Sequence, residues 1–116
     1  MEIINKSNGL KAADIYSLTK GNTVRKMADA KGEILDIRKY IMYTDKDQHD
    51  NDIIILAVET AEGVRYATNS KTFCRNFSDI LAIFEADPES VMPTRFIVGS
   101  ARSNGGREYL TCDIAP

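Results

Sequence analysis

The sequence contains no tryptophan, only one histidine and only two cysteines among its 116 residues, so several kinds of site have little to be built from. His49 lies in an acidic segment, and no pattern connects it to Cys74 or Cys112. Cysteine-based catalysis and a serine triad both need an imidazole held beside the nucleophile, so we expect no enzymatic activity. Two cysteines are also too few for a disulfide scaffold and do not form a metal-ligand pair. We predict buried, reduced thiols and no metal or cofactor.

Long apolar runs are also lacking. Met1–Lys6 does not have the apolar stretch of a signal peptide, and no later run approaches membrane-spanning length. We therefore expect a cytoplasmic protein without a membrane partner. Its 43% hydrophobic and 28% charged residues are ordinary for a globular protein, and 116 residues are enough for one domain with a modest core.

One amphipathic segment, Ser70–Ala86, is central to the expected fold. Its large apolar residues recur at helical spacing and form one stripe: Phe73, Phe77, Ile80, Leu81 and Phe84. Either Asn69 or Ser70 can cap the start of this helix, and Asp87-Pro88 ends it. We expect Phe73, Phe77, Leu81 and Phe84 to be buried beneath a sheet.

Five strand-like runs surround this helix, three before it and two after it. They cover residues 33–43, 53–59, 64–68, 95–100 and 107–114. A helix between the third and fourth of five strands is the element order of an OB-fold, a Greek-key barrel that often binds oligonucleotides or oligosaccharides. We therefore predict a mainly β fold, with one domain over residues 1–116 and a five-stranded OB-fold barrel over residues 33–116.

Residues 1–32 are predicted to form a helical N-terminal extension outside the barrel. A short edge strand at Ile3-Ile4 precedes a weak helix over residues 10–19, and a second helix is expected from Thr23 to Gly32. The extension is expected to close one end of the barrel. A position beside a ligand is the alternative.

The net charge of −2 conceals an uneven distribution. Residues 45–52 hold four aspartates and one lysine, whereas residues 6–39 and 95–107 are both basic. Because a bound phosphate chain responds to local charge, a nucleic-acid partner is not excluded. The acidic segment begins like a calcium loop but lacks glycine at the sixth position and a carboxylate at the twelfth, where Leu56 stands. We predict that it is a solvated turn.

The polar strand faces supply the candidate binding residues. Proteins that bind single-stranded nucleic acid need cations for phosphates and flat side chains on which bases stack. In the first long strand Leu35, Ile37 and Ile41 are expected on one face, opposite Asp36, Arg38, Tyr40 and Met42. In the last strand, Arg107 and Tyr109 are expected to face outward while Leu110, Cys112 and Ile114 face inward.

The orientation of three further residues stays open. Arg65 and Tyr66 are adjacent, so only one of them can join the binding face, and Phe96 is ambiguous in the same way. The complete set of candidates is Arg38, Tyr40, Arg65, Tyr66, Phe96, Arg102, Arg107 and Tyr109. Arginine and tyrosine are also enriched in protein interfaces, so a protein–protein interaction module is the alternative function.

The sequence also resembles a known family. The similar positions are Ala67-Thr68-Asn69-Ser70, Phe73, Arg75, Phe77, Gly99, Ser100, Ser103, Gly106-Arg107, Tyr109 and Cys112, with Asp14-Ile15-Tyr16 nearer the start. They are similar to the small single-stranded DNA-binding proteins of phages and prophages of Gram-positive bacteria. The resemblance implies an OB-fold protein that coats exposed single-stranded DNA, without strong sequence preference, during replication or recombination.

This resemblance extends to Arg107 and Tyr109 as DNA-binding residues. It also makes other replication or recombination proteins, and a second copy of the chain, candidate partners. The chain differs from bacterial single-stranded DNA-binding proteins because it lacks tryptophan and a long acidic tail. The resemblance therefore does not imply that a tail recruits partner enzymes.

Overall fold

The computed structural model describes residues 1–116 and is mainly β. The strands are β1 (Glu2–Lys6), β2 (Arg25–Lys26), β3 (Ile34–Lys46), β4 (Asp52–Thr60), β5 (Arg65–Thr68), β6 (Arg95–Arg102) and β7 (Glu108–Ile114). The helices are α1 (Ala12–Thr19), the short 3₁₀ helix η1 (Met27–Ala30) and α2 (Lys71–Glu85). None of these helices combines the length and the apolar character needed to cross a membrane.

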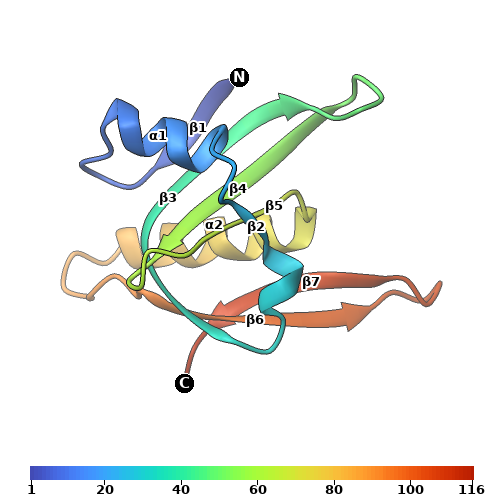
Figure 1. The fold of residues 1–116 in the computed structure, drawn as a ribbon. Helices are drawn as coiled ribbons and strands as arrows, with labels where there is room; N and C mark the ends of the chain where they lie inside the picture. Colours follow the sequence, from blue (N-terminus) through green and yellow to red (C-terminus); the bar gives the residue numbers. More distant parts are fainter.

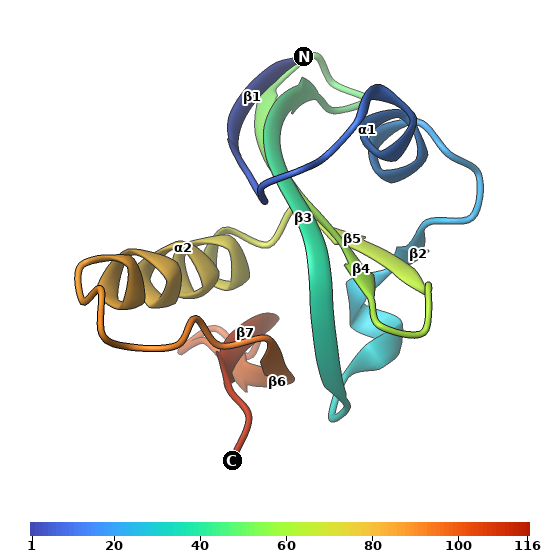
Figure 2. The same ribbon diagram turned by 90° about the vertical axis from the view of Figure 1, so that its left-hand side faces the viewer.

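The strands form one curled, half-barrel sheet around β3. Their order is β2-β5-β4-β3-β6-β7, and β1 pairs with β3 beside this path. Only β2 and β5 run parallel; the other pairs are antiparallel. Figure 1 shows the β3–β4 and β6–β7 hairpins projecting to the same side of the molecule. In Figure 2, α2 lies on the same side of β3 as β6 and β7.

The main core lies between α2 and the curled sheet. Ser70 caps the helix, because its hydroxyl accepts a hydrogen bond from the Phe73 amide at 3.2 Å. Phe73, Phe77 and Leu81 are buried, as predicted. Phe84 is only half-buried and lies outside the main core, so the prediction is wrong for this residue.

A bulge in β3 changes which side chains face the main core. The pairing with β4 shifts between Ile37 and Lys39. Ile37, before the shift, and Met42, after it, both lie in the main core, whereas Ile41 lies in a second apolar cluster. An extra residue in one strand reverses the alternation of its faces beyond that point. The prediction that Leu35, Ile37 and Ile41 share one face is therefore wrong.

The first third of the chain contributes two short strands to the sheet, which corrects the prediction of an extension outside the barrel and confirms the predicted edge strand at Ile3-Ile4 as part of β1. β1 pairs with β3, and β2 pairs with β5. The helix α1 is confirmed, but the second predicted helix is replaced by β2 and the single 3₁₀ turn of η1. Met27 and Ala30 of η1 are buried in the main core. Such a short segment has little helical stability of its own, so tertiary packing decides its conformation.

Candidate nucleic-acid interface

An open groove of about 840 Å³ lies where β5 continues into α2. Its apolar surface includes Ile55, Ala67 and Leu110, and its borders come from η1, the first turn of α2 and the start of β7. The β3–β4 and β6–β7 hairpins project on either side of this junction (Figure 1). The groove therefore lies at the open side of the half-barrel.

Three cations line this groove without carboxylate partners. They are Lys26 next to η1, Lys71 at the start of α2 and Arg107 before β7. No ion pair within 4.0 Å involves any of them. The one acidic residue of the groove, Glu108, pairs with Lys31, and this contact lowers the pKa of its carboxyl. The groove is therefore locally positive although the chain is acidic overall.

Tyr109 supplies the aromatic ring of the groove. This residue is 37% exposed, whereas Cys112 of the same strand is buried. The prediction that Ile114 also faces inward is wrong, because this residue is 38% exposed near the end of the strand. Two hydrogen bonds hold β7 against α2: the Ser70 hydroxyl donates to the Leu110 carbonyl at 3.3 Å, and the Cys112 amide donates to Asn76 Oδ1 at 3.1 Å. The strand that carries Tyr109 is thus fixed relative to the helix that carries Lys71.

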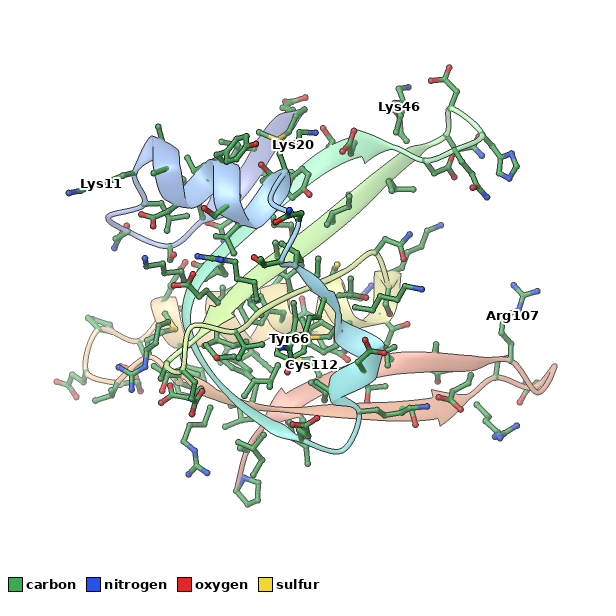
Figure 3. The ribbon with its side chains drawn as sticks, in the orientation of Figure 1. Lys11, Lys20, Lys46, Tyr66, Arg107 and Cys112 are labelled. Atoms are coloured by element: carbon green, nitrogen blue, oxygen red, sulfur yellow. The ribbon has the colours of Figure 1, made fainter.

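The β6–β7 hairpin ends in a tight turn that sets the position of Arg107. The Ser103 amide donates to the Arg107 carbonyl at 2.9 Å, and the Gly106 amide donates to the Ser103 carbonyl at 2.9 Å. Gly106 has a φ of 78°, which a residue without a Cβ adopts easily. In Figure 3, the Arg107 side chain extends from this hairpin into the space between the two hairpins.

The acidic β3–β4 tip has a different organisation. Asp47 Oδ1 accepts hydrogen bonds from the amides of His49 at 2.8 Å and Asn51 at 2.9 Å, and these bonds lower the pKa of its carboxyl. Asp52 lies 2.6 Å from Lys46, and Asp45 lies 3.7 Å from Lys20. No group of three or more His, Cys, Asp or Glu side chains is arranged to hold a metal ion. The tip is a turn in which three of the four aspartates, Asp45, Asp47 and Asp52, have partners in the chain.

Three of the predicted stacking residues are not on the outer surface. Tyr66 and Phe96 are 8% and 2% exposed, respectively, and both belong to the main core. Tyr40 is half-buried and packs edge-on against Phe77, with 5.2 Å between ring centroids. The β3 bulge explains why Tyr40 is half-buried, because the bulge turns this side chain toward the core. Tyr40 is therefore corrected from the surface to the core, and Tyr66 and Phe96, whose orientation the sequence left open, face the core.

The remaining arginines lie outside the groove. Arg65 takes the surface position in place of Tyr66, but its Nε lies 2.8 Å from Glu59 and its Nη1 donates to Thr23 at 3.1 Å. Arg38 donates two hydrogen bonds to Asp36, at 2.8 and 2.9 Å, and borders a separate cavity of about 390 Å³ with Tyr40. Arg102 is exposed and pairs across the ladder with Glu108.

Of the eight predicted residues, the groove therefore brings together Arg107 and Tyr109 and adds Lys26 and Lys71, which sequence reasoning missed. The sequence contains a partial signal for Lys71, because it follows the cap residue Ser70 directly. No local pattern marks Lys26, since its position depends on the pairing of β2 with β5.

Both cysteines are buried, as predicted. Burial raises the pKa of the Cys74 thiol to about 11 and that of Cys112 to about 12. Thiols with such values remain protonated near neutral pH and are poor nucleophiles. They serve as small apolar groups between α2 and β7.

Comparison of the chain with models of known protein families, with curated proteins and with solved structures finds no match.

Proposed function

We propose that this chain is an OB-fold protein that binds single-stranded DNA in the groove between its two hairpins. The connectivity supports the fold assignment. Five strands and one helix follow in the order β3, β4, β5, α2, β6 and β7, and β3 pairs with both β4 and β6. An OB-fold is a partly open Greek-key barrel that binds ligands on its second and third strands and between two of its hairpin loops. The lining of the groove by Ile55 of β4, by Ala67 and Thr68 of β5 and by the start of β7 supports this proposal.

The observation that carries the proposal is the combination of Lys26, Lys71 and Arg107 around the exposed ring of Tyr109. The cations can bind phosphates without first breaking an ion pair, and the phenol ring offers a flat surface to a base. Stacking and phosphate contacts tolerate any base, so binding is expected to be independent of sequence. The resemblance to phage and prophage proteins supports a role in coating DNA during replication or recombination.

The proposal is tested by removing the three groove cations together. The variant Lys26→Gln, Lys71→Gln, Arg107→Gln is compared with wild type by fluorescence anisotropy, using oligo-dT of about 15 nucleotides and a duplex of the same length at two salt concentrations. Each single-strand phosphate contact contributes about 0.7 to the slope of log affinity against log salt, so the slope should decrease by about 2. Wild type should prefer the single strand.

A second variant with the same change in charge is the control. Lys6, Lys11 and Arg95 are exposed, have no ion-pair partner within 4.0 Å and do not line the groove. Figure 3 shows Lys11 at the side away from the hairpins. Changing these three residues to Gln should affect binding much less. Equal losses in the two variants, or no binding of wild type to oligo-dT, would contradict the proposal.

A further inference from the structure

A second groove of about 380 Å³ lies between the β3–β4 hairpin and the first half of α2. Its principal lining residues are Met42, Ile54, Lys71, Cys74, Arg75 and Ser78. Asn69 and Lys71 line both this groove and the main groove. The two grooves therefore meet at the junction between β5 and α2.

The two grooves adjoin consecutive residues of β4. Asp52, Ile53 and Ile54 line the second groove, whereas Ile55 lines the main one. The last residue of β5, Thr68, pairs with Leu56, so β5 does not extend alongside residues 52–55 of β4. A flexible chain that follows the lining of both grooves therefore passes around the end of β5.

The second groove has the same kind of lining as the main one. Lys71 and Arg75 are four residues apart on α2 and therefore lie on one side of the helix. Neither has a carboxylate within 4.0 Å, and Asp52, the acid in this groove, lies 2.6 Å from Lys46. Beside the two cations, Ile54 is 46% exposed and offers an apolar surface.

We propose that single-stranded DNA continues from the main groove around the β5–α2 junction and into the second groove. Arg75 contacts a phosphate there, and a base lies against Ile54. This inference rests on the proposed function and extends it, because it defines a second part of the DNA path. The consequence is that the contribution of Arg75 depends on the length of the bound strand.

The test compares Arg75→Gln with wild type on two lengths of oligo-dT, about 5 and about 15 nucleotides, near the two ends of the range that one OB-fold binds. The short strand can be held by the main groove alone, so its affinity should not change. The long strand should bind more weakly, with a salt slope lower by about 0.7. Arg75 is exposed, and the melting temperature of the variant should match wild type.

Arg95→Gln is the matched control, because it removes the same charge from β6 outside both grooves. An unchanged long-strand affinity in Arg75→Gln, or equal losses at both lengths, would overturn the second part of the path. If the triple variant of the main groove still lowers the affinity for both lengths of oligo-dT, the proposed function stands without the second part of the path. If wild type binds neither length, both proposals fail.

Discussion

The two hairpins beside the main groove have opposite charges and use them differently. At the β3–β4 tip, Asp47 accepts hydrogen bonds from the backbone, and Asp45 and Asp52 have lysine partners. At the β6–β7 hairpin, Arg107 has no acidic partner, and its strand carries the exposed Tyr109. The acidic groups mainly organise their own turn, whereas Arg107 and Tyr109 remain available to a ligand.

This difference shows why the net charge of −2 is a poor guide to the partner of this chain. At physiological ionic strength, charges separated by more than about 8 Å in solvent are largely screened from each other. Under the proposed function, a phosphate in the groove would therefore interact mainly with Lys26, Lys71 and Arg107, which line it. The aspartates of the β3–β4 tip make the net charge negative, but none of them lines the groove.

The largest effect is expected from Tyr109 on the β6–β7 hairpin. Stacking of a base on one aromatic ring is worth about 1–3 kcal/mol, so Tyr109→Ala should weaken oligo-dT binding by roughly ten- to a hundredfold with little change in salt slope. Tyr109→Phe keeps the ring and should retain most of the affinity. Tyr16→Ala, which removes a 66% exposed ring from α1, should have no effect.

Melting temperatures of the same variants distinguish a binding role for Tyr109 from a structural one. Its ring shares the groove with Met27 and Ala28, so it could also support this part of the fold. A destabilised Tyr109→Ala variant with wild-type affinity per folded molecule would remove Tyr109 from the binding site. The proposed contrast between the two hairpins would then rest on Arg107 alone.

A smaller effect is expected from acid at the β3–β4 tip. Amide hydrogen bonds, first from Asn51 and then from His49, lower the pKa of Asp47 below its ordinary value of 3.8. A carboxyl with a lower pKa in the folded state stabilises that state above its unfolded pKa, and the stabilisation is lost as pH falls through the folded value. The turn should therefore loosen as pH decreases below about 3.8.

Hydrogen-exchange protection of individual amides measures this loosening. The His49 and Asn51 amides should lose protection several-fold in acid, relative to the Ser103 and Gly106 amides, whose acceptors are backbone carbonyls that do not titrate in this range. Asp47→Asn should reduce the pH dependence at His49 and Asn51. An equal loss of protection at both tips would show that acid unfolds the whole domain instead.

The smallest effect is expected from Asp50. This residue has a φ of 63°, a conformation that asparagine also tolerates, so Asp50→Asn removes one negative charge without straining the turn. Oligo-dT affinity should rise by about twofold or less at low salt and stay unchanged at physiological salt, as titrations at the two salt concentrations can show. A large loss of affinity that divalent metal reverses would indicate that the acidic tip is a metal site.

The sequence predicts the elements with regular periodicity better than it predicts their faces. The helical stripe of Phe73, Phe77 and Leu81, and the strands on both sides of it, follow from spacing alone. The bulge near Arg38 does not follow from spacing, because a one-residue shift in strand pairing does not change the composition. It nevertheless reverses the faces of the side chains beyond it. The alternation of the sequence therefore places Tyr40 on the wrong face.

The candidate site is less predictable than the fold because it joins distant parts of the chain. Arg107 and Tyr109 share one strand, so alternation is enough to place them on one side. Lys26 and Lys71 approach them only through the pairing of β2 with β5 and the packing of α2 on β7. Phe96 and Tyr66 could not be oriented in advance, because both lie in strands where apolar residues occur on both faces.

The position of β3 also has a consequence for the order in which the chain can fold. This strand pairs with its neighbour β4 and also with β6, which begins about 50 residues after β3 ends. Contacts so distant in sequence form slowly, since a long loop must close before they contribute. During synthesis the edge of β3 at Ile34–Asp36 and the ring of Phe77 remain without their partners until β6, which carries Phe96, has been made. Residues 95–114 thus complete both the core and the β7 wall of the groove, so the chain acquires its stable fold and its proposed binding surface together.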